Sequence, residues 1–173
     1  MARTKLVSPI LLSDRISIVD LALLTPASYR SGRIIYKRRK TGKWYDIKVL
    51  PQAARILDFY LGYNTLNTGY ILPIINHKTD NQETIMRNVK GRTKLINKYI
   101  KKLGELIDYD GEITTYTVRH SWATIAKKLG YSNEVIAEAL GHEYGNAITN
   151  VYLDSFDKVV IDKANEKVSK SIQ

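Results

Sequence analysis

Apolar side chains recur every three to four residues in several stretches of the chain, which is the spacing of one helical face. The pattern predicts helices near residues 14–24, 51–63, 82–106 and 115–129, with one more in the polar tail at 157–170. Ser132-Asn133-Glu134 supply good capping residues for a further helix, and Gly141 lies where a left-handed C-terminal cap is expected. A short helix is expected to carry Tyr152.

Two runs rich in β-branched and aromatic residues, 33–37 and 44–49, flank the sequence Lys40-Thr41-Gly42-Lys43. Such runs on either side of a short glycine-containing segment predict a β-hairpin. The sequence shows no internal repeat and no low-complexity tract. We therefore expect an α+β protein that is mainly α-helical, with a small antiparallel β-sheet packed on a helical bundle.

The composition is that of one globular domain with an unusually basic balance. The chain has 173 residues, of which 44% are apolar and 25% charged, and its net charge is +10. A charge of this size favours nucleic acid or an anionic membrane surface as a partner. No apolar run approaches the roughly 18 residues of a membrane span. The two Trp and two Phe are scattered, unlike those of an amphipathic membrane helix. Double-stranded DNA is the preferred partner, with no membrane.

The residue inventory narrows the chemistry. The chain has no cysteine, so it has neither disulfides nor a thiolate nucleophile, which fits a cytoplasmic protein. Its three histidines form no closely spaced pair, so a metal site is not expected. A nucleotide-binding GxxxxGK[ST] loop is absent as well. We expect no cofactor and no small-molecule substrate.

Three residues of the last third have side chains suited to phosphodiester chemistry. Arg119 precedes His142 by 23 positions, and Tyr152 follows 10 positions later. A guanidinium can bind two phosphate oxygens, an imidazole can move a proton, and a phenol can attack phosphorus. Each residue alone has a simpler explanation: a surface arginine, a loop histidine, or one tyrosine among twelve. Their joint spacing favours a shared site.

The motifs around these residues resemble the catalytic domain of the tyrosine recombinase (phage integrase) family, and in particular integrases of Bacteroides-type mobile elements. The most specific match is the block from Tyr116-x-x-Arg119-His-Ser-Trp-Ala-Thr through Leu-Gly-His142 to Thr149-x-x-Tyr152-Leu. The Lys40-Thr41-Gly42 turn and the segments 19–24 and 70–73 match more weakly. The resemblance covers nearly the whole chain and implies the catalytic fold of that family.

The resemblance also implies roles for individual residues. Tyr152 is the nucleophile, Arg119 is the second of two catalytic arginines, and His142 assists proton removal or binds the phosphate. Lys40 is the general acid that protonates the leaving oxygen. Tyr116 stands where the family usually has histidine; a phenol with a pKa near 10 is a poor base at neutral pH, so Tyr116 is expected to orient the phosphate.

The first catalytic arginine of the family has no counterpart at the matching position. Counting back three positions from the acidic Asp20 leads to Ser17. Arg15, two residues earlier, can take over this role, or an arginine of the hairpin can do so. Arg38 and Arg39, which lie in the hairpin turn, are candidate DNA-binding residues in either case.

A basic stretch between residues 87 and 102 contains no acidic residue. Its simplest explanation is a solvated helix face. Together with a phosphodiester site, a track along the DNA backbone becomes the better interpretation. The residues expected to contact DNA there are Lys94, Lys98 and Lys101.

The expected function is site-specific DNA recombination or integration through a 3′-phosphotyrosyl intermediate. A homo-tetramer assembled on DNA and a bacterial, nucleoid-associated location follow from the resemblance. Residues 1–173 are expected to form the catalytic domain alone, without the N-terminal domain that completes a clamp around DNA. The alternatives are a type IB topoisomerase-like strand transferase and an inactive DNA-binding module with the same fold.

Overall fold

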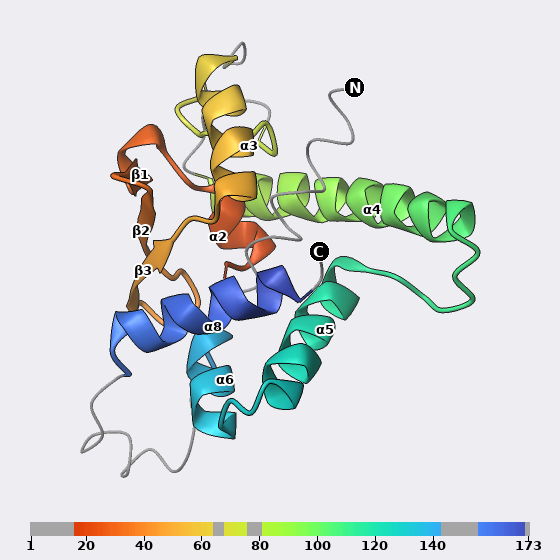
Figure 1. Ribbon diagram of the computed structural model, residues 1–173. Coiled ribbons are helices and arrows are strands. Elements are labelled where there is room, and N and C mark those ends of the chain that lie inside the picture. The colour runs from red at the N-terminus through yellow and green to blue at the C-terminus, as the bar shows by residue number, and fades with distance from the viewer. Residues whose placement is uncertain (1–15, 64–67, 76–80, 143–155, 172–173) are drawn as a thin grey trace.

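The computed structural model describes residues 16–63, 68–75, 81–142 and 156–171 (Figure 1). It is mainly α-helical with one small antiparallel sheet, which confirms the predicted fold class. In chain order the elements are α2 (Ile18–Ala22), the 3₁₀ helix η2 (Pro26–Ser28), β1 (Tyr29–Arg30), β2 (Arg33–Lys37), β3 (Trp44–Lys48), α3 (Pro51–Gly62), α4 (Gln82–Leu106), α5 (Thr115–Lys128), α6 (Asn133–Ala139) and α8 (Lys158–Lys170).

The three strands pair in the order β1-β2-β3, and all neighbours are antiparallel. The β2–β3 hairpin is the predicted one. Its turn closes through hydrogen bonds from Gly42 N to Arg38 O (2.7 Å) and from Arg38 N to Lys43 O (2.8 Å). Gly42 has φ +69°, a conformation that favours glycine. The third strand, β1, was not predicted, since two residues are too few to produce an alternating pattern.

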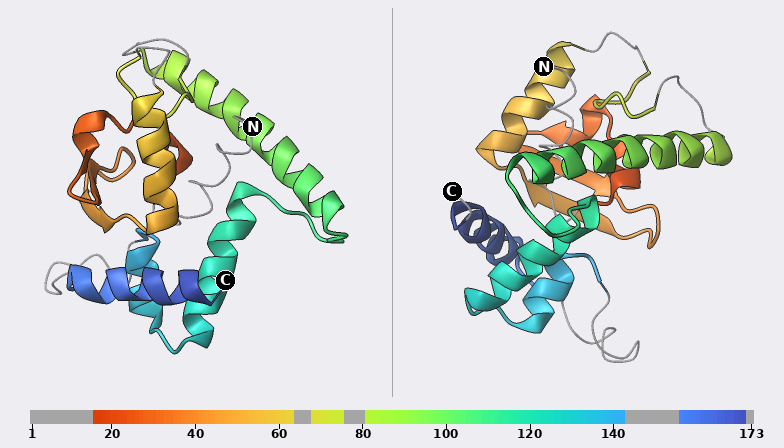
Figure 2. Two further views of the ribbon diagram at one scale, coloured as in Figure 1. Left: turned by 45° about the horizontal axis from the view of Figure 1, so that its top comes forward. Right: turned by 90° about the vertical axis from the view of Figure 1, so that its right-hand side faces the viewer.

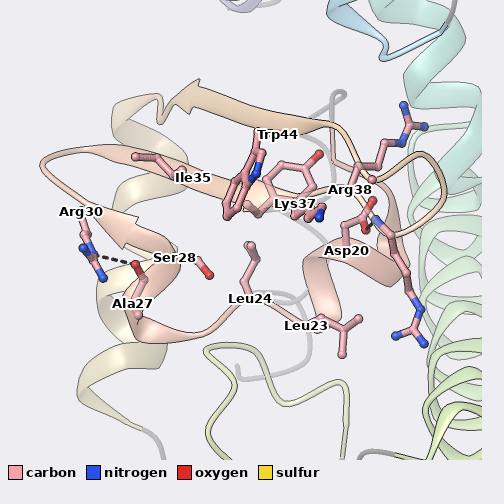
Figure 3. Close-up of a pocket in the computed structure, with 13 residues that line it drawn as sticks. Asp20, Leu23, Leu24, Ala27, Ser28, Arg30, Ile35, Lys37, Arg38 and Trp44 are labelled. Carbon is pink, nitrogen blue, oxygen red and sulfur yellow. Dashed lines mark hydrogen bonds between the residues drawn. The ribbon is translucent and has the colours of Figure 1, made fainter.

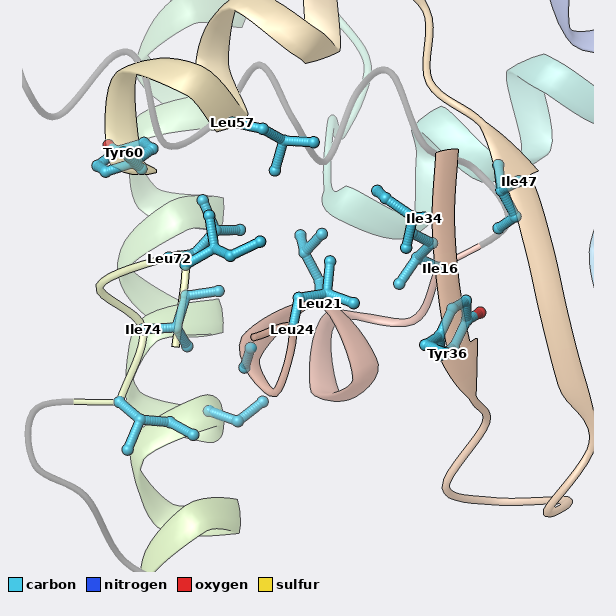
Figure 4. Close-up of a cluster of buried hydrophobic side chains, with 14 of the residues drawn as sticks. Ile16, Leu21, Leu24, Ile34, Tyr36, Ile47, Leu57, Tyr60, Leu72 and Ile74 are labelled. Carbon is cyan, nitrogen blue, oxygen red and sulfur yellow. The ribbon is translucent and has the colours of Figure 1, made fainter. Parts of the chain in front are cut away.

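One hydrophobic core lies between the sheet and the helices α2, α3 and α4. Figure 4 shows Leu21 and Leu24 of the α2 region facing Ile34 and Tyr36 on the sheet. Leu72 and Ile74 lie on the opposite side of α2 and, like Ile71 and Ile75, are almost fully buried. This core fixes α2 against the hairpin.

A second core joins α5, α6 and α8. Figure 2 shows these three helices side by side from two further directions. Trp122 of α5 lies in it, 4% exposed, together with Ala139 of α6 and Ile161 and Val168 of α8. The two cores therefore comprise different parts of the chain, and the hairpin and the end of α6 belong to different ones.

An ion-pair network holds α8 against the sheet. Asp46 of β3 accepts from Arg33 Nε (2.5 Å) and from Lys158 Nζ (2.6 Å), and Arg33 Nη1 also donates to Asp162 (2.9 Å). Partial burial raises the pKa of Asp46, but the hydrogen bonds from Lys158 and Arg33 outweigh it and leave that pKa below its usual value. Lys48 and Glu166 add a more exposed pair at 2.7 Å.

The long helix α4 has the predicted bounds, but part of its predicted apolar face is exposed. Its buried side chains are Ile85, Val89, Ile96 and Ile100. Four other apolar residues of this helix are 39% to 79% exposed: Met86, Leu95, Leu103 and Leu106. Met86 and Leu95 lie at the edges of the buried stripe, and the last two lie in the final turn, beyond the residues that pack on α2. Leu129 after α5 is likewise exposed, at 43%.

The first helix begins later than predicted, at Ile18, because Ser17 caps it: Ser17 Oγ accepts from Asp20 N at 3.1 Å. None of the helices within the described ranges has both the length and the apolar composition needed to cross a membrane.

Candidate active site

Helix α5 presents Arg119 at the edge of its buried face. Thr114 caps the helix by accepting from Tyr116 N and Thr117 N, and Asn97 of α4 accepts from Thr115 N at 3.1 Å. Trp122, one turn after Arg119, is anchored in the second core. The rotation of α5 is thus fixed at its start and near its middle, and Arg119 remains partly exposed.

The turn after α6 fixes the position of His142. Gly141 N donates to Glu138 O (2.9 Å) and His142 N donates to Ala137 O (2.8 Å), the bond pattern of a Schellman C-terminal cap. Gly141 has the positive φ, +68°, that this cap requires. The predicted left-handed cap is confirmed, and it directs the backbone carbonyls of this turn toward the neighbouring side chains.

Arg119 and His142 come together at this turn. Arg119 Nη2 donates to Leu140 O and lies 3.3 Å from His142 Nε2. Partial burial lowers the pKa of His142, and the positive charges of Arg119, Arg38 and Lys40 lower it further. The imidazole is therefore neutral at neutral pH and able to accept a proton.

The hairpin supplies a further guanidinium to the same turn. Arg38 Nη1 donates to Gly141 O, across 103 positions of sequence. The Arg38 side chain is only 9% exposed, and its guanidinium carbon lies 5.9 Å from the centre of the Tyr45 ring. Lys40, in the exposed turn, acts on His142 through its charge. Nothing in the sequence pattern indicated the contact between Arg38 and Gly141.

Asp20 joins the start of α2 to the end of the hairpin. Its carboxylate accepts from Ser17 Oγ (2.7 Å) and from Arg39 N (2.9 Å), and the residue is 5% exposed. The Ser17 position is thereby held beside the residue that follows Arg38. Sequence reasoning treated Asp20 only as a motif residue, although an aspartate in an apolar helix is a sign of a buried polar contact.

The other predicted residues are distributed as follows. Tyr116 lies in the first turn of α5, 65% exposed, with its ring edge-on to His120 at 4.4 Å. Arg39 is exposed in the hairpin turn. The lysines predicted to contact DNA are all exposed along α4: Lys94, Lys98 and Lys101. Tyr152 and Arg15 lie outside the described residues.

A pocket of about 640 Å³ lies beside this cluster, between the hairpin and the α2–β1 connection (Figure 3). Leu24, Ile35 and Trp44 line it. Arg38 extends from the hairpin end away from Trp44, and neither Arg119 nor His142 lines the pocket. Arg38 is itself among the residues that line the pocket, so the pocket adjoins the cluster on the hairpin side. Over the described ranges, no group of three or more acidic, histidine or cysteine side chains is arranged to hold a metal ion.

Comparison with protein families gives a match over most of the chain. The model described as "Phage integrase family" matches residues 18–158, which is well over half of the 173-residue chain. The matched range includes Arg38, Arg119 and His142 as well as Tyr152. No curated protein matches the chain.

Proposed function

The chain belongs to the phage integrase family of site-specific tyrosine recombinases, and on this premise we propose that it breaks and rejoins DNA strands through a 3′-phosphotyrosyl intermediate. The observation that carries the proposal is the convergence of Arg119 and His142. Two separate elements bring a guanidinium and a neutral imidazole within 3.3 Å of each other on an accessible surface. That pair suits an anionic ester whose attacking group must lose a proton.

In the proposed reaction, Tyr152 Oη forms a bond to the scissile phosphorus while the bond from phosphorus to the 5′ oxygen breaks. His142 accepts the phenolic proton, and Lys40 donates a proton to the departing 5′ oxygen. Arg119 stabilises the additional negative charge on the non-bridging oxygens, an effect typically worth about 3–4 kcal/mol per preorganised donor. Rejoining reverses these steps, so the bond energy stays in the tyrosyl ester and no nucleotide is consumed.

The proposed partner is double-stranded DNA, bound by a homo-tetramer during strand exchange. The basic face of α4 and the hairpin turn supply the phosphate contacts, because both are exposed and rich in lysine and arginine. We further propose that the activity belongs to a mobile genetic element, on the resemblance of the motifs to Bacteroides-type integrases. Tyr116, exposed one turn before Arg119, is suited to orient the phosphate by a hydrogen bond.

The test is trapping of the covalent intermediate on nicked duplexes. A nick beside the scissile phosphate lets the leaving strand diffuse away, so that the adduct accumulates. Because the target site is unknown, the duplexes carry a randomised centre, and the DNA recovered with the protein is sequenced to define the site. Peptide mapping by mass spectrometry should locate the nucleotide on Tyr152.

Tyr152→Phe should form no adduct while keeping its DNA affinity, since only the attacking oxygen is lost. Tyr109→Phe is the matched control, because Tyr109 is an exposed tyrosine between α4 and α5 to which no role in the reaction is assigned. An adduct on another residue, or full adduct yield from Tyr152→Phe, would refute the assignment. Relaxation of supercoiled plasmid without any recombination between paired sites would instead indicate the topoisomerase-like activity.

A further inference from the structure

Arg38 is a buried cation whose hydrogen bonds are incomplete. The residue is 9% exposed, and Nη1 donates to Gly141 O. Its Nε is fully buried and has no acceptor among the described residues. A buried N–H without an acceptor is costly in free energy. A buried guanidinium is therefore rarely left in this state unless a bound group accepts its remaining hydrogen bonds.

Arg38 also has no carboxylate partner in the described part of the chain. The ion pairs found there use Arg33, Lys48 and Lys158 instead. Asp20 is the acidic residue beside the hairpin end, and each of its oxygens already accepts from another donor, Ser17 or the Arg39 backbone. Arg38 therefore takes part in none of the ion pairs of the described residues.

Arg38 and Arg119 bind successive carbonyls of one turn. Arg119 donates to Leu140 O and Arg38 to Gly141 O, while the following residue, His142, is exposed to solvent. Both guanidinium groups, together with Lys40, act on the His142 imidazole. Like charges repel when held this close, so the arrangement favours an anion placed between them.

We propose that Arg38 is the second phosphate-binding guanidinium of the active site, and that it binds the scissile phosphate together with Arg119. This inference rests on the proposed function. It assigns to a hairpin residue the role of the family's first catalytic arginine, which is absent at Ser17. The Asp20 contacts to Ser17 and Arg39 hold that position next to the hairpin end, so Arg38 enters the same region from the sheet. The Tyr45 ring supports the guanidinium from the inner face of the sheet.

The competing explanation is that Arg38 only braces the Gly141 turn. The two roles differ in their response to the charge of the substrate. A methylphosphonate replaces one charged non-bridging oxygen of the scissile phosphate with a neutral methyl group. A guanidinium that neutralises that charge becomes dispensable on this substrate, whereas a structural brace remains necessary.

The experiment measures the adduct formation rate of the full chain on nicked duplexes with either a phosphate or a methylphosphonate at the scissile position. Arg38→Met is compared with wild type and with the matched control Arg55→Met, an exposed arginine of α3. On the phosphate substrate, Arg38→Met should be about 10²–10³-fold slower than wild type, the usual effect of removing one such donor. On the methylphosphonate, the two rates should agree within about tenfold.

Equal rates for Arg38→Met and wild type on the phosphate would overturn the proposal, and so would equal loss on both substrates. If Arg38→Met fails to fold, Arg38→Lys replaces it. An ammonium can keep the hydrogen bond to Gly141 O but cannot donate the second hydrogen bond that a guanidinium gives to a phosphate. In a separate experiment, inorganic phosphate is titrated into the protein without DNA, and the chemical shifts of the His142 imidazole are followed by NMR. Wild type should show saturable shifts that Arg38→Lys weakens and Arg55→Met does not. If wild type forms no adduct at all, the proposed function fails, while the phosphate titration still decides whether Arg38 binds an anion.

Discussion

Replacement of Gly141 by alanine should disable the site by displacing Arg38. Gly141 has φ +68°, so any other residue is strained there whatever the space around it. A Cβ at this position would also collide with Arg38 Nη1 and would lie 2.9 Å from Tyr45 Oη. Arg38 would have to move away from the Gly141 carbonyl, and the turn that carries His142 would shift with it.

The expected loss of folding stability is the sum of the backbone strain at residue 141 and the lost hydrogen bond of Arg38. A left-handed conformation costs a non-glycine residue about 1–2 kcal/mol. Loss of a hydrogen bond from a charged donor adds about 1.5–3 kcal/mol. Gly141→Ala should therefore lower the free energy of unfolding by about 2.5–5 kcal/mol, a fall in melting temperature of about 5–20 °C for a chain of this size.

Gly130→Ala is the matched control. Gly130 has a similar backbone, φ +83°, and also follows a helix, but a Cβ there would meet nothing within 4 Å. It should show the backbone cost alone, about 1–2 kcal/mol, with an unchanged rate of adduct formation. Thermal unfolding and adduct kinetics of both variants provide the comparison. Equal destabilisation and equal kinetics for the two alanines would show that the approach of Arg38 to Gly141 is unimportant.

Three further predictions concern charge. Asp46→Asn should cost about 1–2 kcal/mol in urea unfolding at neutral pH, between the values for surface and buried ion pairs. Because the pKa of Asp46 is lowered in the folded state, the difference in free energy of unfolding between wild type and Asp46→Asn should be full above about pH 4. It should shrink as the pH falls through the lowered folded-state pKa, and a difference independent of pH would contradict this prediction. Alanine at Lys94, Lys98 and Lys101 should reduce the slope of log K against log salt by up to about 0.9 per lost phosphate contact, and an unchanged slope would make this face merely solvated. Arg119→Lys should lose most of the cleavage rate despite keeping its charge, and a loss below about tenfold, or 1.4 kcal/mol, would argue against a transition-state contact.

The elements predicted best were those determined by local sequence. The bounds of α4 and of the hairpin strands followed from apolar spacing and from the Gly42 turn. Which apolar residues of α4 are buried could not be predicted, because periodicity identifies a face but not the length over which another element covers it. Leu103 shares a face with Ile85 and is nevertheless exposed, since it lies beyond the contact with α2.

The candidate site could likewise be predicted only where its residues share a local motif. The pairing of Arg119 with His142 was expected from their joint motif, and the elements that carry them, α5 and α6, share one core. The contact between Arg38 and Gly141 joins positions 103 residues apart, and no spacing rule reaches that far. Sequence reasoning could state that a guanidinium was missing at position 17, but only the packing of the hairpin against α6 indicates where another one lies.

The site is built across two cores, so its geometry depends on how the hairpin is oriented relative to α6. That orientation is fixed at two separate places. At one end, Arg38 reaches from the hairpin to the turn after α6. At the other, the Asp46 network ties the same pair of strands to α8, which shares a core with α6. A single contact would leave the hairpin free to pivot, and a pivot would separate Lys40 and Arg38 from Arg119. The ion pairs of Asp46 thus help to hold the hairpin, with Arg38 and Lys40, beside the turn that Arg119 contacts, as the proposed joint binding of a phosphate requires.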